Sequence, residues 1–166
     1  MAENTIENTE TSTENTTVEK YLIFAVRDKH YALPSKIISE VAALEKIFPL
    51  PLVPGYVRGI INRYSVPYAL IDICFLLQKS DSNAGKVIVL KEEVDKLAFL
   101  INDVTDIADL PSGKLIKIEQ EEVAGQSGGS LDGSIHAFFE WKGAQVFCLD
   151  TAEIISRIKQ DFEQVT

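Results

Sequence analysis

The residue pattern closest to a catalytic motif is a serine within a glycine-rich stretch. The segment Gly125-Gln126-Ser127-Gly128-Gly129 matches the G-x-S-x-G pattern, in which a nucleophilic serine lies on a sharp turn between a strand and a helix. Asp132 and His136 could supply an acid and a base. The glutamates before the motif and the polar residues after it cannot form that strand and helix, so we expect no enzymatic activity. A small-molecule-binding or hydrolytic β-barrel is the alternative.

Side chains that could bind a metal are few and widely spaced. His30 and His136 are the only histidines, and neither has a second ligand at a useful spacing. Asp103, Asp106 and Asp109 recur at every third residue, but residues three apart on a strand face opposite sides of the sheet. We therefore expect these carboxylates to be solvated or to lie at strand ends, and we expect neither a metal nor a cofactor.

The charge of the chain argues against a nucleic-acid partner. The formal net charge is −9 and the sequence pI is about 4.7, so the protein would repel a phosphate backbone. Arginine and aromatic residues are not interleaved as they are in proteins that bind single strands, which disfavours an RNA-binding barrel.

The N-terminal residues differ in composition from the rest of the chain. Residues 1–19 contain five acidic residues and no Lys or Arg. Residues 1–18 have too few apolar side chains to offset the entropy of ordering, so they are predicted to form a disordered acidic tail. No apolar run approaches the roughly 20 residues of a membrane helix, and no secretion signal is recognisable. We expect a cytoplasmic protein without direct membrane insertion, in which Cys74 and Cys148 are buried thiols.

Apolar residues beyond the tail come in short runs separated by turn residues, which predicts an all-β barrel architecture. Only the C-terminal segment has helical periodicity, after a cap at Asp150 or Thr151. Its predicted buried stripe consists of Ile154, Ile155, Ile158 and Phe162. Strands are expected at 21–26, 31–33, 36–41, 56–61, 66–71, 86–91, 97–107, 134–141 and 144–149, with a short helical turn at 72–77.

A series of short motifs follows in a fixed order along the chain. The motifs are Tyr21-Leu22-Ile23-Phe24, Tyr31-Ala32-Leu33-Pro34, Ile38-Ser39-Glu40-Val41, the run 51–62, Leu70-Ile71-Asp72, the run 100–107 and the run 146–150. In this order and spacing they resemble the CheW family of chemotaxis coupling proteins, over about residues 19–160.

This resemblance implies a fold and a function. The fold would be two small five-stranded barrels, SH3-like or OB-like, packed together with a C-terminal helix. The CheW-like domain would span residues 19–166 as two intertwined barrel subdomains that divide at roughly residues 72–86. The function would be that of a non-enzymatic adaptor between the cytoplasmic tips of methyl-accepting chemotaxis receptors and a CheA-like histidine kinase.

The resemblance also assigns roles to residues. Glu40 would orient a partner and Val41 would be an apolar anchor, although Val41 could equally be barrel core and Glu40 an ordinary exposed strand residue. Gly59 would permit a close backbone approach or a strand kink. The residues implied to bind partners are Ile38, Glu40, Val41, Arg58, Asn62, Arg63 and Tyr64.

The chain departs from the family pattern after Asn62. Counted without gaps from Gly59 to Asp72, the Arg-Gly pair of the family falls on Tyr64-Ser65. A shift of one residue would place Arg63 at the arginine position, but it lengthens the spacing to Asp72 by one. Since tyrosine lacks the fixed charge and forked donors of arginine, the choice between the two alignments bears on partner specificity.

Overall fold

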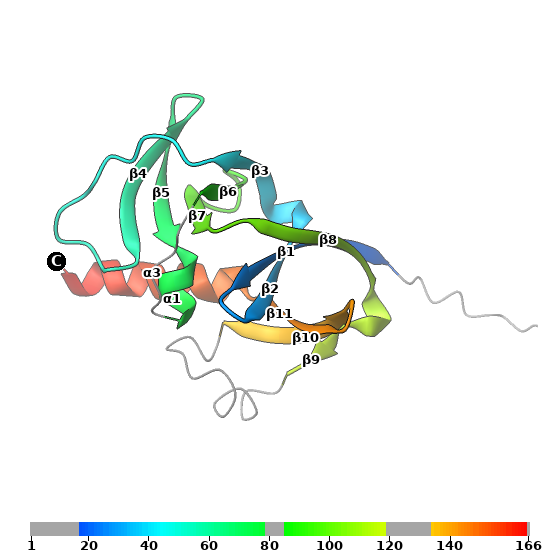
Figure 1. The fold of residues 1–166 in the computed structure, drawn as a ribbon. Coiled ribbons are helices and arrows are strands. Elements are labelled where there is room, and N and C mark those ends of the chain that lie inside the picture. Colours follow the sequence, from blue (N-terminus) through cyan, green and yellow to red (C-terminus); the bar gives the residue numbers. More distant parts are fainter. Residues whose placement is uncertain (1–16, 79–84, 119–133, 166) are drawn as a thin grey trace, which may run out of the picture.

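The computed structural model describes residues 17–78, 85–118 and 134–165 (Figure 1). The Ser127 motif and Asp132 lie outside the described residues, as do residues 1–16 of the expected tail. The hydrolytic alternative and the disorder of the tail therefore stay predictions as far as the structure is concerned.

Two sheets form the described part of the chain. The six-stranded sheet, called barrel A, has the order β8-β1-β2-β11-β10-β9, and the five-stranded sheet, called barrel B, has the order β3-β6-β7-β5-β4. The strands are β1 (Val18–Val26), β2 (Lys29–Pro34), β3 (Ile38–Ala43), β4 (Val57–Arg63), β5 (Val66–Asp72), β6 (Lys86–Leu90), β7 (Leu97–Ile101), β8 (Val104–Pro111), β9 (Ile116–Lys117), β10 (Ile135–Trp141) and β11 (Ala144–Leu149). The helices are η1 (Ser35–Ile37), α1 (Ile73–Gln78), η2 (Ser112–Lys114) and α3 (Thr151–Val165). The predicted double barrel with a C-terminal helix is confirmed, with the two-residue strand β9 as an addition.

The chain crosses between the barrels twice. It forms β1 and β2 in barrel A, then β3 to β7 in barrel B, and returns to barrel A with β8. Barrel A is thus assembled from segments on either side of barrel B in the sequence. The subdomain division expected near residues 72–86 stays a prediction.

The two barrels follow one plan. Each has a parallel strand pair between antiparallel pairs, β2 with β11 in barrel A and β7 with β5 in barrel B. The hairpins β10–β11 and β4–β5 have two-residue turns. An aspartate at the end of each hairpin caps the helix that follows. Asp72 accepts a hydrogen bond from the Phe75 amide at 3.1 Å, and Asp150 accepts one from the Glu153 amide at 3.2 Å. Asp150 and Thr151 were the two residues expected to cap the last helix, and it is Asp150 that accepts the capping hydrogen bond.

Apolar side chains form a cluster inside each barrel and a larger cluster between the barrels. Strand β7 contributes to two of these clusters, because all five of its residues are buried and they point to both sides of the sheet. Ala98 and Leu100 point into barrel B, whereas Leu97, Phe99 and Ile101 belong to the central cluster. A strand buried on both faces gives a continuous apolar run in the sequence instead of an alternating one.

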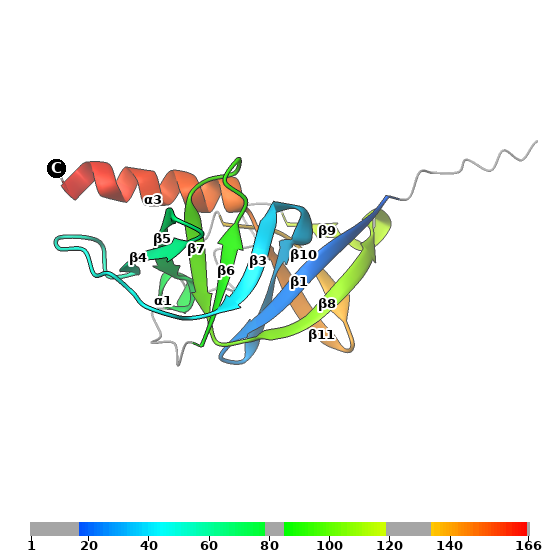
Figure 2. The ribbon, with the colours of Figure 1, turned by 90° about the horizontal axis from the view of Figure 1, so that it is seen from above.

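Helix α3 joins the two barrels. It starts after the last strand of barrel A and runs across β7, β5 and β4 (Figure 2). Ile154 and Ile158 are buried in the central cluster, and Ile155 and Phe162 pack against it, which confirms the predicted stripe. None of the helices in the described residues has the length and apolar character needed to span a membrane.

The expected single strand at 97–107 is wrong. It is two strands, β7 in barrel B and β8 in barrel A, separated at Asn102 and Asp103. The two strands differ in their partners, because β7 pairs with β6 and β5 whereas β8 pairs with β1. His30, which falls between the strands expected at 21–26 and 31–33, lies within β2.

Candidate functional site

β3 and β4 are the two end strands of barrel B, and the segment after β3 lies against β4 along a line that we call the seam. Beyond β3, the Phe48 amide donates to the Ile60 carbonyl and the Ile60 amide donates to the Phe48 carbonyl, both at 2.8 Å. Gly59 has φ 138°, and a methyl group there would overlap the Phe48 carbonyl oxygen. The close backbone approach expected at Gly59 is therefore what lets the segment after β3 lie against β4.

An ion pair, here called the barrel-B clasp, crosses the seam. Arg63 Nε donates to Glu40 Oε1 at 2.8 Å, and Arg63 Nη2 donates to Glu40 Oε2 at 3.0 Å. This fork geometry fixes the orientation of both side chains. The hydrogen bonds to Glu40 raise the pKa of Arg63 above its ordinary value. The two side chains are only 19% and 25% exposed, so the clasp is a fixed part of the surface.

Tyr64 and Ser65 form the turn after Arg63. Strand pairing places Arg63 opposite Val66 and Asn62 opposite Pro67, so these two residues make the two-residue turn of the β4–β5 hairpin. Arg63 occupies the last position of β4, from which its forked donors reach Glu40. Which of the two alignments to the family pattern applies stays a prediction.

Tyr64 is an exposed aromatic side chain beside the barrel-B clasp. The residue is 85% exposed, and the Arg63 guanidinium lies 5.3 Å from the centroid of the Tyr64 ring. Tyr64 and Ser65 have φ angles of 52° and 66°, a left-handed conformation that costs about 1–2 kcal/mol for a residue with a side chain. Strain of this kind persists where the surrounding structure fixes it, and it often marks functional surfaces.

The other residues predicted to bind partners are Ile38, Val41, Asn62 and Arg58, and only Arg58 lies far from the clasp along β4. Ile38 and Val41 on β3 are half-buried and pack against the central cluster, and Val41 faces the opposite side of the strand from Glu40. Asn62 is exposed and lies on β4 beside Arg63. Arg58 lies away from the clasp, near the other end of β4.

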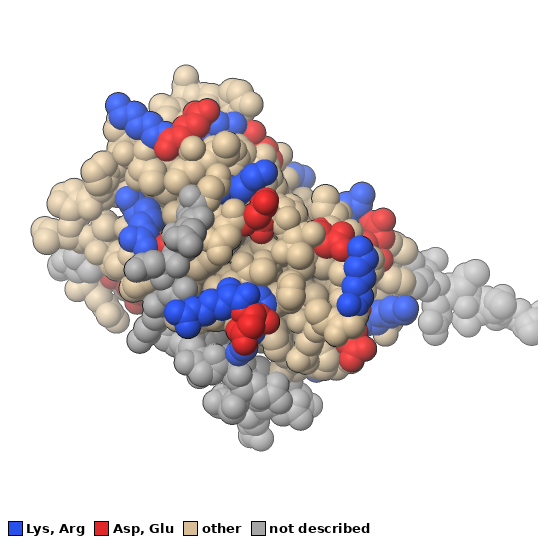
Figure 3. All heavy atoms as spheres, in the orientation of Figure 1, with Lys and Arg blue, Asp and Glu red and all other residues tan. Residues whose placement is uncertain are grey.

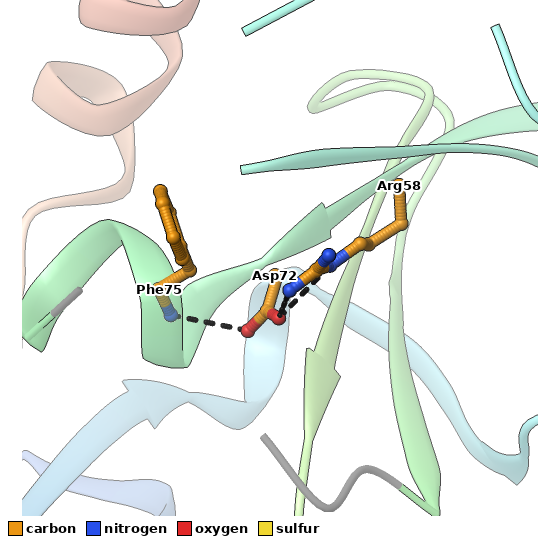
Figure 4. Close-up of polar contacts among 3 residues, drawn as sticks. All are labelled: Arg58, Asp72 and Phe75. Carbon is orange, nitrogen blue, oxygen red and sulfur yellow. Dashed lines mark hydrogen bonds and ion pairs between the residues drawn. The ribbon is translucent and has the colours of Figure 1, made fainter. Parts of the chain in front are cut away.

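Arg58 belongs to an ion pair beneath the surface (Figure 4). Its Nε and Nη2 atoms donate to Asp72 Oδ2 at 3.1 and 2.7 Å, while Asp72 Oδ1 caps α1 through Phe75. The Asp72 side chain is fully buried and that of Arg58 is 36% exposed. This arrangement gives Arg58 a structural role, and contact of Arg58 with a partner stays a prediction.

Two exposed features of the surface were missed by the sequence analysis. Phe48 is 47% exposed at the seam, and Ile107 is 54% exposed on β8. The proline after Phe48 was a signal that the segment is held extended. Nothing in the local sequence shows that Ile107 points outward.

A second cluster, the barrel-A clasp, occupies the matching edge of the other barrel. Trp141 Nε1 donates to Asp106 Oδ2 at 2.7 Å, and Lys142 Nζ lies 2.8 Å from the same oxygen. Asp106 therefore differs from the expected solvated carboxylate, whereas Asp109 is 67% exposed and 3.9 Å from Lys20. The side chains diverge as the strand geometry predicted. No group of residues that could hold a metal occurs in the part of the chain that is described.

The barrel-A clasp should make stability depend on pH. The hydrogen bonds from Lys142 and Trp141 lower the pKa of Asp106 from 3.8 to about 2. Because the pKa is lower in the folded state, the stabilisation is present above about pH 4 and is lost as the pH falls toward 2. Urea midpoints of the wild type and Asp106→Asn should differ at neutral pH and converge near pH 2. The exposed Asp109→Asn is the matched control, and a difference for Asp106→Asn that is constant with pH would contradict the assignment.

Comparisons with known proteins agree on one kind of domain. Residues 20–159 match the CheW-like domain. Among solved structures, the scaffolding protein TtCheW from Thermoanaerobacter tengcongensis is similar, with a TM-score of 0.67 and 14% identity over 80% of this chain and 89% of that chain. At this identity the likeness concerns the fold. No curated protein matches the sequence.

Proposed function

The chain belongs to the CheW-like domain family, whose members are non-enzymatic adaptors of chemotaxis signalling, and from this premise we propose that it couples the cytoplasmic tips of chemoreceptors to a CheA-type histidine kinase. The observation that carries the proposal is the rigid face at the seam of barrel B. There β3 supplies Glu40, β4 supplies Arg63 and the turn supplies Tyr64. The proposed partners place the site of action in the cytoplasm.

The surface beside the clasp suits a protein partner better than a small molecule. Phe48, which is 47% exposed at the seam, offers apolar surface, and the clasp supplies a polar border next to it. Interfaces gain most of their affinity from a few such apolar or aromatic anchors surrounded by polar residues. Family membership also argues against the hydrolytic alternative. That alternative would be revived if the wild type had esterase activity and Ser127→Ala lost it.

Binding to the two proposed partners tests this function. The purified chain should bind a CheA-type kinase fragment and a chemoreceptor cytoplasmic fragment with dissociation constants of about 1–10 μM, measured by titration calorimetry. An adaptor must bind both, so absence of binding to either fragment would contradict the proposal.

Charge reversal at the barrel-B clasp should weaken partner binding. Glu40→Arg and Arg63→Glu each place like charges across the seam, so each should lose about tenfold or more in affinity. The exchanged pair, Glu40→Arg with Arg63→Glu, restores opposite charges and should recover part of the loss. The exposed Lys20→Glu serves as control, because it changes charge away from the seam. Single variants that bind as well as wild type would show that the clasp is not part of the interface.

A further inference from the structure

Two helices each reach from one barrel to the other. Helix α1 follows the β4–β5 hairpin of barrel B, and its last residue, Gln78, donates from Nε2 to the Val26 carbonyl and the Tyr31 hydroxyl of barrel A, both at 3.2 Å. Helix α3 follows the β10–β11 hairpin of barrel A, and its Asp161 accepts a hydrogen bond at 2.5 Å from the hydroxyl of Tyr56, which directly precedes β4 of barrel B. Each helix thus has, near its C-terminal end, a polar contact with a tyrosine of the opposite barrel. We call these contacts the α1 brace and the α3 brace.

Apolar side chains form most of the contact between the barrels. Tyr31 and Tyr56 both belong to the central cluster, as do Leu77 of α1 and Ile158 of α3. Apolar burial holds two surfaces together but has no preferred direction, whereas a hydrogen bond depends on the distance and angle between its partners. Packing therefore supplies most of the attraction between the barrels, and the two braces are suited to fixing their relative orientation.

The α3 brace is shielded from water. Tyr56 is only 8% exposed, and burial together with the bond to Asp161 raises the pKa of Tyr56 above its ordinary value, so the hydroxyl remains a donor. A second contact of α3 with barrel B, from Lys159 Nζ to Asp95 Oδ2 at 3.3 Å, is weaker because the Lys159 side chain is 68% exposed and water screens its charge. Asp161 lies beyond the residues that match the family, so family membership assigns it no role.

The ion pairs of the two clasps do not join the barrels. Glu40 and Arg63 both belong to barrel B, and Asp106 and Lys142 both lie in barrel A. Figure 3 shows blue and red groups side by side at several places on this face of the molecule, with uncharged surface between them. These pairs stabilise each barrel by itself, which leaves the relative orientation of the barrels to the central cluster and the braces.

We propose that Gln78 and Asp161 are positioning residues that hold the two barrels at one fixed angle, each through a tyrosine of the opposite barrel. The inference deepens the proposed function and rests on it, because an adaptor can hold two large proteins in one relative geometry only if its own halves do not turn against each other. Loss of a brace leaves both barrels folded, since each has its own apolar cluster and its own clasp. It allows one barrel to tilt against the other on the central cluster.

Spin labels on the two barrels test whether the angle is fixed. Asp109→Cys on β8 of barrel A and Glu93→Cys in the exposed turn between β6 and β7 of barrel B provide labelling sites, whereas the native Cys74 and Cys148 are buried. Pulsed electron paramagnetic resonance on this chain should give one narrow distance distribution. Removal of one brace should broaden the distribution, and removal of both should broaden it further.

Tyr56→Phe removes only the hydroxyl of the α3 brace, and Gln78→Leu removes the donor of the α1 brace. Amide hydrogen exchange in the last two turns of α3 should become about two- to tenfold faster in Tyr56→Phe, as expected for the loss of one hydrogen bond. Tyr21→Phe is the matched control, because the partner of that hydroxyl, Glu19, lies in the same barrel, and it should leave the distance distribution unchanged.

Two variants of Asp161 separate positioning from a general loss of stability. Asp161→Asn keeps an oxygen that accepts from Tyr56 and should retain the narrow distribution of the wild type. Asp161→Ala removes the acceptor and should broaden the distribution. Because alanine is the best helix former, that broadening would not arise from a weaker helix α3.

Binding measurements separate this inference from the proposed function. The affinity of the receptor fragment for the chain already bound to the kinase fragment should fall about threefold or more in the variant without both braces, since only part of the population keeps the competent orientation. A distribution for this variant as narrow as that of the wild type would overturn the inference, whether or not the partners bind. Unchanged assembly despite a broadened distribution would overturn it as well. If the wild type binds neither fragment, the proposed function fails, and the distance distributions still decide whether the braces set the angle.

Discussion

Replacing Asp72 by alanine should destabilise the fold by about 2–4 kcal/mol, because it removes two charge-assisted hydrogen bonds from Arg58 and the cap of α1. Asp72 is fully buried at the end of β5, where Arg58 donates two hydrogen bonds to one carboxylate oxygen. The other oxygen caps α1 through the Phe75 amide. One side chain thus joins β4, β5 and α1, and its loss acts on all three.

Urea unfolding followed by circular dichroism measures this effect. Asp72→Asn should cost less than Asp72→Ala, because asparagine still caps a helix although it cannot neutralise Arg58. Asp109→Ala is the control, since Asp109 is 67% exposed in a long ion pair and should change stability by no more than about 0.5 kcal/mol. A midpoint for Asp72→Ala as close to wild type as that of the control would refute the structural role.

The hairpins and the last helix could be predicted from sequence because their signals are local. Lys142-Gly143 gives the residue type that a two-residue turn requires, and Asp150 gives a helix cap directly before a periodic stripe. The break between β7 and β8 could not be predicted in the same way. Local sequence shows that a segment is extended, but the sheet it joins depends on partners far along the chain, here β1 for β8.

The candidate site was predictable in its residue types but not in its contacts. The resemblance pointed to Glu40, Arg63 and Tyr64, yet the pairing of Glu40 with Arg63 depends on how barrel B closes. The ungapped count of residues suggested a lost arginine, and only the structure showed that Arg63 pairs with Glu40. The ion pair of Arg58 with Asp72 was likewise invisible, because the two lie 14 residues apart on neighbouring strands.

Replacing Gly59 by alanine should destabilise the protein by about 2–5 kcal/mol, since it combines backbone strain with a steric overlap in a packed region. Gly59 has φ 138°, and an added methyl group would overlap the Phe48 carbonyl oxygen and lie 2.9 Å from its carbon. That contact is backbone against backbone, so no side-chain rotation relieves it. The segment carrying Phe48 must move away from β4, which opens the seam.

Two other glycines separate the causes of this effect. Gly143 also has a positive φ, 81°, but an added methyl group meets nothing within 4 Å, so Gly143→Ala should cost only about 1–2 kcal/mol of strain. Gly113 has open space and no left-handed φ, so Gly113→Ala should be neutral or stabilising by about 0.4–1 kcal/mol. Thermal unfolding should therefore rank the variants Gly113→Ala, Gly143→Ala and Gly59→Ala in order of increasing loss. Only Gly59→Ala should also weaken binding of the receptor fragment, because only that methyl group displaces the wall of the seam. Equal losses for Gly143→Ala and Gly59→Ala would mean that strain alone acts, and that the close approach of Phe48 to β4 does not hold the seam together.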